Sequence, residues 1–311
     1  MKKNLVKSFF RRLILEILDF LFNRNWFFKF LGKVNRKKQF ITGLFLMHPQ
    51  ERKYGLYFAF SARLKRNQKT WDPFFSGIIV SKKKMSLMFS VSSDGRQIIR
   101  KSNQDKLLHL YQKLFKIANY LGLSDNPRQA IRFAGIIPGI LARRGISVES
   151  PEAEISAELV VLGIKNLLEE GKANLRMPIV VLGAKGFVGQ RVCKKIKEDE
   201  GIGNPLFAID VQNTWPGFNI PIAAVDVTLQ SAIINYLELI PKGSIIINEV
   251  YPPPNLEVVA LFEKKDISVY HFSGFDGKAY PNLPFAYNRC IPFCAAMSSE
   301  GVKVIIRRMG V

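Results

Sequence analysis

Three glycines in the middle of the chain have the spacing of a phosphate-binding turn. Gly183, Gly186 and Gly189 follow an apolar run at 179–182 and open an amphipathic helix that we expect over 188–197. Gly183 allows a tight turn, Gly186 allows the backbone to approach a pyrophosphate, and Gly189 allows the helix to pack close to the strand. This order of strand, turn and helix is what a dinucleotide-binding βαβ unit requires.

The start of that helix supplies the remaining contacts. The amides of Phe187, Val188 and Gly189 lie in its first turn, where backbone N–H groups have no partner within the helix. The positive end of the helix dipole favours an anion at the same place. We therefore expect Gly183, Gly186, Phe187, Val188 and Gly189 to bind the cofactor.

An acidic residue follows the next strand. The apolar run 206–209 ends in Asp210, roughly 20 residues after Gly189, which is where an acid binds the adenine ribose. Because a carboxylate accepts from a 2′-hydroxyl and repels a 2′-phosphate, we expect NADH to be preferred, with NADP(H) left open. The alternative interpretation is a βαβ unit whose glycines serve packing alone and which binds nothing.

A thiol near the C-terminus is the candidate nucleophile. Cys294 comes where a helix is expected to begin, and a cysteine at a helix N-terminus has a lowered pKa because the dipole stabilises the thiolate. Cys290, next to Arg289, is the competing candidate. The alternative is a buried, inert thiol, which is the fate we expect for Cys193 inside the 188–197 helix.

The cysteine and histidine patterns exclude other kinds of site. An odd number of cysteines without paired spacing argues against a disulfide framework or a structural zinc site, and indicates a reducing, intracellular compartment. His48, His109 and His271 have no metal-ligand spacing with another histidine, aspartate or cysteine. We therefore expect no metal site.

Composition describes a basic, globular protein. The chain has 311 residues, 48% of them hydrophobic, which is enough for two domains with separate cores. The 46 Lys and Arg against 25 Asp and Glu give a formal net charge of +21. Such a balance suits an acidic protein, an anionic membrane or a nucleic acid. Of these three partners, nucleic acid is the one we do not expect.

Residues 1–38 form a basic amphipathic extension. Apolar residues recur at helical spacing, and the segment contains 11 Lys and Arg against 2 Asp and Glu. This pattern favours a helix in the interface of an anionic membrane, and equally a helix that docks on its own domain. Charged residues interrupt every apolar stretch before it could span a bilayer. We expect a cytoplasmic protein, with peripheral attachment to the inner membrane face as one alternative.

The rest of the chain is expected to form two α/β domains. In the substrate domain, 39–152, we expect strands at 40–47, 76–80 and 85–91, a hairpin turn at 92–95 with a returning strand at 97–99, and a helix at 104–121. A Rossmann-type domain, 153–311, follows after a helix at 153–170. Its parallel sheet adds strands at 220–227, 244–248 and 267–272 to the two already described. A C-terminal helix could pack back on the substrate domain.

Several of these segments resemble the long-chain acyl-(acyl carrier protein) reductases, which form fatty aldehydes. Val181-Leu-Gly-Ala-Lys-Gly-Phe-Val-Gly-Gln-Arg-Val-Cys193 is similar to the family pattern Val-Gly-Ala-x-Gly-x-Ile-Gly-x-x-Val-Cys. Glu249-Val-Tyr-Pro252 falls in the family order, and Pro292-Phe-Cys-Ala-Ala-Met297 resembles the segment that holds the family's acyl-accepting cysteine. The similarity extends from about Phe40 to Met309.

The resemblance implies a complete reaction. The thiolate of Cys294 would attack the thioester of a fatty acyl group on acyl carrier protein or coenzyme A, and hydride from the nicotinamide would release an aldehyde. Acyl carrier protein is acidic, which suits a basic enzyme. The chain departs from the family at 150–156, where a Thr/Gly/Asn-rich stretch is missing. It also has Asp210 where the NADPH-preferring family carries an arginine.

Two other interpretations remain open. One is a shikimate- or polyol-type NAD(P) dehydrogenase, which shares this architecture and has no covalent step, although no matching Lys/Asp motif occurs in the first domain. The other is a membrane-associated protein that keeps a nucleotide-binding fold without being an enzyme. A glutamyl-tRNA reductase is disfavoured, because it needs a nucleophilic cysteine in its first domain and no cysteine precedes Cys193.

Overall fold

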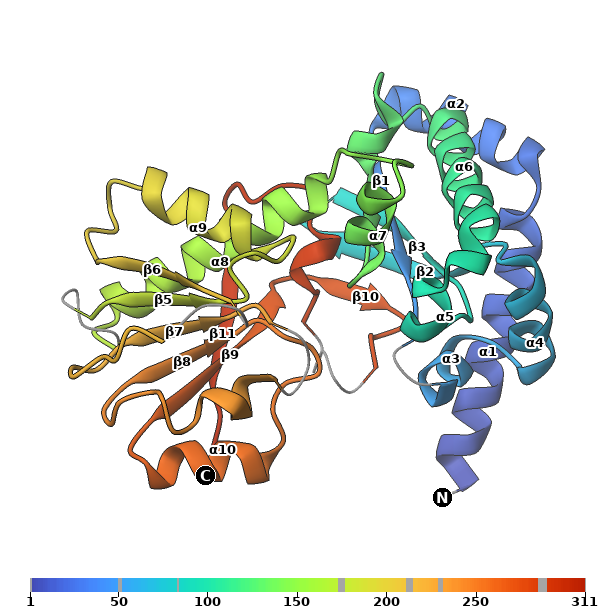
Figure 1. Ribbon diagram of the computed structural model, residues 1–311. Coiled ribbons are helices and arrows are strands. Elements are labelled where there is room, and N and C mark those ends of the chain that lie inside the picture. Colours follow the sequence, from blue (N-terminus) through green and yellow to red (C-terminus); the bar gives the residue numbers. More distant parts are fainter. Residues whose placement is uncertain are drawn as a thin grey trace. The chain divides into compact units, whose positions relative to one another are not determined.

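Two separate β-sheets organise the chain, which the computed structural model describes over residues 2–49, 52–82, 84–172, 177–210, 215–228, 232–284 and 290–310. Each sheet belongs to its own compact unit (Figure 1). Unit 1 comprises the chain up to Glu152 together with 277–285 and 294–297. Unit 2 comprises 153–276, 286–293 and 298–311.

Unit 1 is a five-stranded sheet with helices packed against it. Its strands are β1 (Ile41–Met47), β2 (Phe74–Ser81), β3 (Lys84–Ser90), β4 (Ile131–Phe133) and β10 (Lys278–Tyr280). Its helices are α1 (Lys2–Phe22), α2 (Asn25–Lys38), α3 (Arg52–Phe58), α4 (Ser61–Thr70), α5 (Gly95–Ile99), α6 (Gln104–Leu121) and α7 (Ile137–Arg143), with 3-10 turns η1 (Lys101–Asn103) and η2 (Pro127–Ala130). The strand order is β10-β2-β3-β1-β4, with β1 parallel to β3 and β4, and with β2 antiparallel to both β3 and β10.

The basic extension is part of unit 1. Helix α2 packs along α6, and α1 packs on β2 (Figure 1). Buried Asn35 of α2 donates to the carbonyl of Ile41 at 2.9 Å and accepts from its amide at 2.8 Å, which fixes the entry into β1. Phe28 is 2% exposed. The alternative that the extension docks on its own domain therefore holds for α2 and for the inner face of α1.

One expected strand is a helix. Residues 97–99 lie in α5, which begins after Asp94 rather than returning as the second arm of a hairpin. The side chain of Asp94 accepts from the amide of Gln97 at 2.9 Å, and the side chain of Gln97 accepts from the amide of Asp94 at 3.2 Å. This reciprocal capping box stabilises the start of a helix at the position where the Asp-Gly pair predicts a hairpin turn.

Unit 2 has the expected parallel sheet. Its strands are β5 (Ile179–Leu182), β6 (Leu206–Ile209), β7 (Ala223–Asp226), β8 (Ile245–Asn248), β9 (Ser268–Phe275) and β11 (Val304–Arg308), in the order β11-β9-β8-β7-β5-β6. Its helical elements are α9 (Gly189–Glu198), α10 (Leu256–Lys264), η3 (Ala232–Tyr236) and most of α8 (Pro151–Glu169). The five strands from β6 to β9 are parallel, and the strand order reverses at β5. The predicted fold class, an α/β unit followed by a Rossmann-type parallel-sheet unit, is confirmed.

Helices cover both faces of this sheet. Val259 and Phe262 of α10 share a buried cluster with Val180 and Val269. Gly163 of α8 lies against the ring of Phe272, on the opposite side of the pleat from Val269. Buried on both faces, the strands can be continuously apolar, as their sequences are.

The C-terminal segment ends in a strand. Among residues 290–310 there is no α-helix, and β11 runs antiparallel to β9 at the sheet edge. The expected C-terminal helix is therefore wrong. The hydroxyl of Ser298 accepts from the amide of Glu300 at 3.1 Å, a local bond that competes with helical hydrogen bonding.

Candidate functional site

The glycine loop has the geometry that its sequence predicts. Gly183 ends β5 with φ +81°, a conformation that residues with a side chain rarely adopt. Its carbonyl accepts from the amide of Gly186 at 2.9 Å, which closes the turn. A Cβ added at Gly189 would overlap the carbonyl oxygen of Gly183, so the helix start and the strand end are in contact only because Gly189 has no side chain.

The first turn of α9 leaves amides available. The first described helical bond is donated by Gln190 to the carbonyl of Gly186, so the amides of Phe187, Val188 and Gly189 precede the helical ladder. The cap residue Val188 has no side chain that could accept from them. This helix start fits a phosphate group, which accepts from several backbone amides at once.

Asp210 lies directly against this loop. Its Oδ2 accepts from the amide of Lys185 at 2.9 Å, so the carboxylate from the end of β6 is fixed beside the turn that follows β5. Together, the two strand ends place backbone amides and one carboxylate at the carboxyl edge of the sheet, where ligands of doubly wound sheets bind.

Two further acids lie at the same edge, and sequence reasoning did not single them out. Asp226 ends β7 and is 1% exposed; its Oδ1 accepts from the amide and the hydroxyl of Thr228 at 3.1 and 2.6 Å. Burial raises the pKa of Asp226, although both bonds from Thr228 oppose the rise. Glu249 follows β8, and burial together with the charge of Asp226 raises the pKa of Glu249 to about 8. An acid directly after an apolar strand was the available signal.

The raised pKa of Glu249 predicts a pH-dependent stability. Because the folded state holds this proton more tightly than a free carboxyl of pKa 4.5, the stability that Glu249 contributes is complete below pH 4.5 and is lost as the pH rises to about 8. We expect Glu249→Gln to raise the melting temperature at pH 8 by roughly 3–8 °C and to change it little at pH 4.5. Melting curves across this range test the prediction, with exposed Glu200→Gln as control. A pH-independent difference would contradict it.

The cysteines differ from the expected arrangement. Cys294 lies in η5 (Phe293–Ala295), a single 3-10 turn, so its expected place at a helix start is wrong. A turn of three residues has almost no dipole, and the argument for a stabilised thiolate does not hold. Cys294 is nevertheless only half-buried, whereas Cys193 and Cys290 are buried. Cys193 lies inside α9, as expected.

Unit 1 holds the backbone that follows Cys294. Arg132 of β4 donates from Nε to the carbonyl of Ala296 at 2.8 Å and from Nη2 to that of Met297 at 3.2 Å. Burial lowers the pKa of Arg132 to about 10. Cys290 lies in unit 2, where Arg307 donates to its sulfur at 3.6 Å and burial raises the pKa of its thiol. Arg289 is outside the described residues.

No group of metal-ligating side chains occurs among the described residues. His271 lies within β9, and burial lowers its pKa to about 4. Its Nδ1 lies 2.9 Å from the side-chain amide of Asn248.

Comparisons with known proteins find only distant likeness, to solved structures. No family model matches the chain, and no curated protein matches it. Among solved structures, the bifunctional methylenetetrahydrofolate dehydrogenase/cyclohydrolase FolD of Campylobacter jejuni is similar over 72% of this chain and 76% of its own, with 12% identity and a TM-score of 0.33. A likeness this weak supports no statement about activity or cofactor.

Proposed function

We propose that the chain is an NAD(P)H-dependent oxidoreductase. The observation that carries the proposal is the turn between β5 and α9, where the absence of a side chain at Gly189 brings the uncapped helix start against the strand end. The pyrophosphate would accept from the amides of residues 187–189, and Asp210 would accept from the adenine ribose. A bound nicotinamide dinucleotide would supply or accept a hydride.

The cofactor preference follows from the charge of Asp210. We expect NADH to bind about tenfold or more tightly than NADPH, because a 2′-phosphate would be repelled by this carboxylate. Titration of the full chain with both cofactors, followed by fluorescence, measures the ratio. Asp210→Asn should reduce the ratio of NADH affinity to NADPH affinity. The control Asp266→Asn, in the turn before β9, should leave this ratio unchanged. Tighter NADPH binding by the wild type would contradict the role of Asp210.

The specific reaction that we propose is reduction of a fatty acyl thioester to an aldehyde. The Cys294 sulfur would bond to the acyl carbon while the carrier thiolate leaves, and hydride addition would then break the new C–S bond. Cys294 is the half-buried one of the three thiols. The positive charge of the chain suits acyl carrier protein, with acyl-coenzyme A as the alternative donor. A shikimate- or polyol-type dehydrogenase is the alternative function.

An acyl adduct tests the covalent step. Incubation with a fatty acyl thioester in the absence of dinucleotide should leave an acyl group on Cys294, because reduction cannot follow. Peptide mapping by mass spectrometry locates the adduct. Cys294→Ser should abolish it, and the matched variant Cys290→Ser should retain it. If no cysteine is modified across several chain lengths and carriers, the thioester reaction is wrong, while dinucleotide binding is tested separately by titration.

A further inference from the structure

The acidic side chains of α1 are paired within unit 1. The only acids in residues 1–38 are Glu16 and Asp19, and both form ion pairs with Arg63 of α4. Asp19 is 2% exposed, and its carboxylate also accepts from the amide of Phe75 at 2.5 Å. Both negative charges of the helix are therefore paired inside unit 1, and neither lies beside the exposed Lys7.

The outer side of α1 is apolar along most of its length. Seven large residues, each 38–60% exposed, recur every three or four positions: Val6, Phe9, Phe10, Leu13, Ile14, Ile17 and Phe20. We refer to these seven as the outer stripe. Soluble monomers rarely expose an apolar patch of this extent, and a stripe bordered by Lys and Arg is typical of helices that lie in a membrane interface. No helix in the described part of the chain is long and apolar enough to cross a bilayer.

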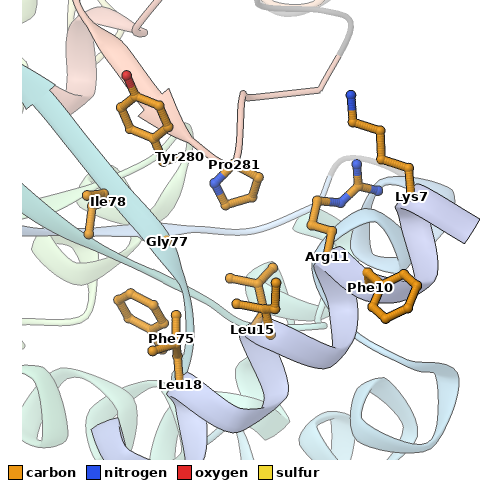
Figure 2. Close-up of a pocket in the computed structure, with 11 residues that line it drawn as sticks. Lys7, Phe10, Arg11, Leu15, Leu18, Phe75, Gly77, Ile78, Tyr280 and Pro281 are labelled. Atoms are coloured by element: carbon orange, nitrogen blue, oxygen red, sulfur yellow. The ribbon is translucent and has the colours of Figure 1, made fainter. Parts of the chain in front are cut away.

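A groove of about 600 Å³ adjoins the outer stripe within unit 1 (Figure 2). Its apolar wall includes Phe10, Ile14 and Leu18 of α1, Phe75 and Ile78 of β2, and Tyr280 of β10. Because Phe10 and Ile14 belong to both, the groove opens onto the outer stripe. Lys7 and Arg11, one helical turn apart, are the charged residues of its lining, and Figure 2 shows them together on α1.

The lining determines what kind of molecule fits. Hydrocarbon needs no hydrogen bonds, whereas a peptide would lose those of its backbone in a groove this apolar. The two cations fit an anionic head group at one end of a hydrocarbon chain. The position of Arg11 is fixed, since its guanidinium lies over the ring of Tyr57 at 3.6 Å and donates to the carbonyl of Tyr57.

We propose that α1 is a membrane-docking helix with a lipid site. The outer stripe lies in the interface of an anionic bilayer, one acyl chain of an anionic phospholipid occupies the groove, and its phosphate pairs with Lys7 and Arg11. This proposal is independent of the reaction proposed above, because every residue that it uses lies in unit 1 and none belongs to the glycine loop.

Cosedimentation of the full chain with vesicles tests the docking surface. We expect binding to vesicles that contain phosphatidylglycerol, little binding to phosphatidylcholine alone, and weakening by salt. Phe9→Ser/Ile17→Ser should lower partitioning at least about tenfold, because two large apolar side chains are lost from the interface. The matched control Leu256→Ser/Leu261→Ser removes two exposed leucines from α10 and should change it less than about twofold. Equal partitioning of the stripe variant and the wild type would overturn the proposal.

Titration with monomeric lysolipids tests the groove. Lysophosphatidylglycerol should bind at least about tenfold more tightly than lysophosphatidylcholine of the same chain length, and Lys7→Gln should reduce this preference. Ile78→Trp should block both lysolipids, while dinucleotide titration and the melting curve show that the variant is folded. Equal binding of the two head groups, or full binding by folded Ile78→Trp, would overturn the lipid site. If the wild type forms a dimer that Phe9→Ser/Ile17→Ser dissociates, and the wild type does not bind vesicles, the proposal is overturned. The outer stripe is then a contact surface for a second copy of the chain.

Discussion

Gly189→Val is expected to weaken dinucleotide binding at least about a hundredfold and to cost about 2–4 kcal/mol of unfolding free energy. The new Cβ would overlap the carbonyl oxygen of Gly183. This neighbour is backbone rather than a flexible side chain, so α9 must move away from the end of β5. The amides of residues 187–189 would then no longer be placed to donate to one phosphate group. Cofactor titration and urea denaturation measure the two effects.

Gly203 provides the matched control. A Cβ added there meets nothing within 4 Å, and Gly203→Ala should leave both the affinity and, within about 0.5 kcal/mol, the stability unchanged. If Gly189→Val loses stability but binds the dinucleotide like the wild type, the glycine serves packing alone, and the alternative of a βαβ unit without a ligand is favoured.

Glu152→Ala is expected to cost about 3–5 kcal/mol of unfolding free energy. Arg128 and Glu152 are 3% and 1% exposed, and Nη2 of Arg128 donates to both carboxylate oxygens at 2.8 and 2.9 Å. Removal of the carboxylate leaves a buried guanidinium without its counter-charge. Nη1 and Nε still donate to Ile131 and Ser147, so the side chain cannot turn outward without losing those bonds as well.

Urea denaturation and a double substitution separate charge from packing. Arg128→Met/Glu152→Leu should recover much of the loss, because it removes both charges together. Glu154→Gln breaks the half-exposed pair with Arg191 and should cost less than about 1 kcal/mol. A loss in Glu152→Ala no larger than in Glu154→Gln would contradict the buried ion pair as a major contributor to stability.

Elements determined by residues close together in the sequence could be predicted, whereas features that depend on distant residues could not. The segment 179–197 was predictable because its strand, turn and helix are determined by neighbouring residues, above all by Gly183 and Gly189. The prediction of a strand at 97–99 was wrong because of a local interaction. The capping bond between Asp94 and Gln97 outweighs the hairpin preference of Asp-Gly. The groove could not have been predicted, because β10 joins β2 from a distance of about two hundred residues along the chain.

The candidate site shows the same division. The place of Asp210 beside the loop follows from the adjacent parallel strands, but the bond from the Lys185 amide depends on their three-dimensional register. The raised pKa of Glu249 arises from burial beside Asp226, which no linear spacing reveals. The prediction that Cys294 begins a helix was wrong. The apolar, small-residue stretch around it is compatible with a helix, but the hydrogen bonds of Ser298 and Arg132 hold it in another conformation.

The return of residues 277–285 and 294–297 to unit 1 bears on how this protein is made. During synthesis, α1 to α7 emerge before unit 2, but β10, which pairs with the otherwise free edge of β2, emerges only after β5 to β9. Until β10 is made, the edge of β2 in nascent unit 1 is therefore unpaired, and an unpaired strand edge can pair with other chains. The segment that follows β9 therefore completes both units, since it contains β10 of unit 1 and β11 of unit 2. Neither unit is a contiguous module that recombination could transfer intact to another gene.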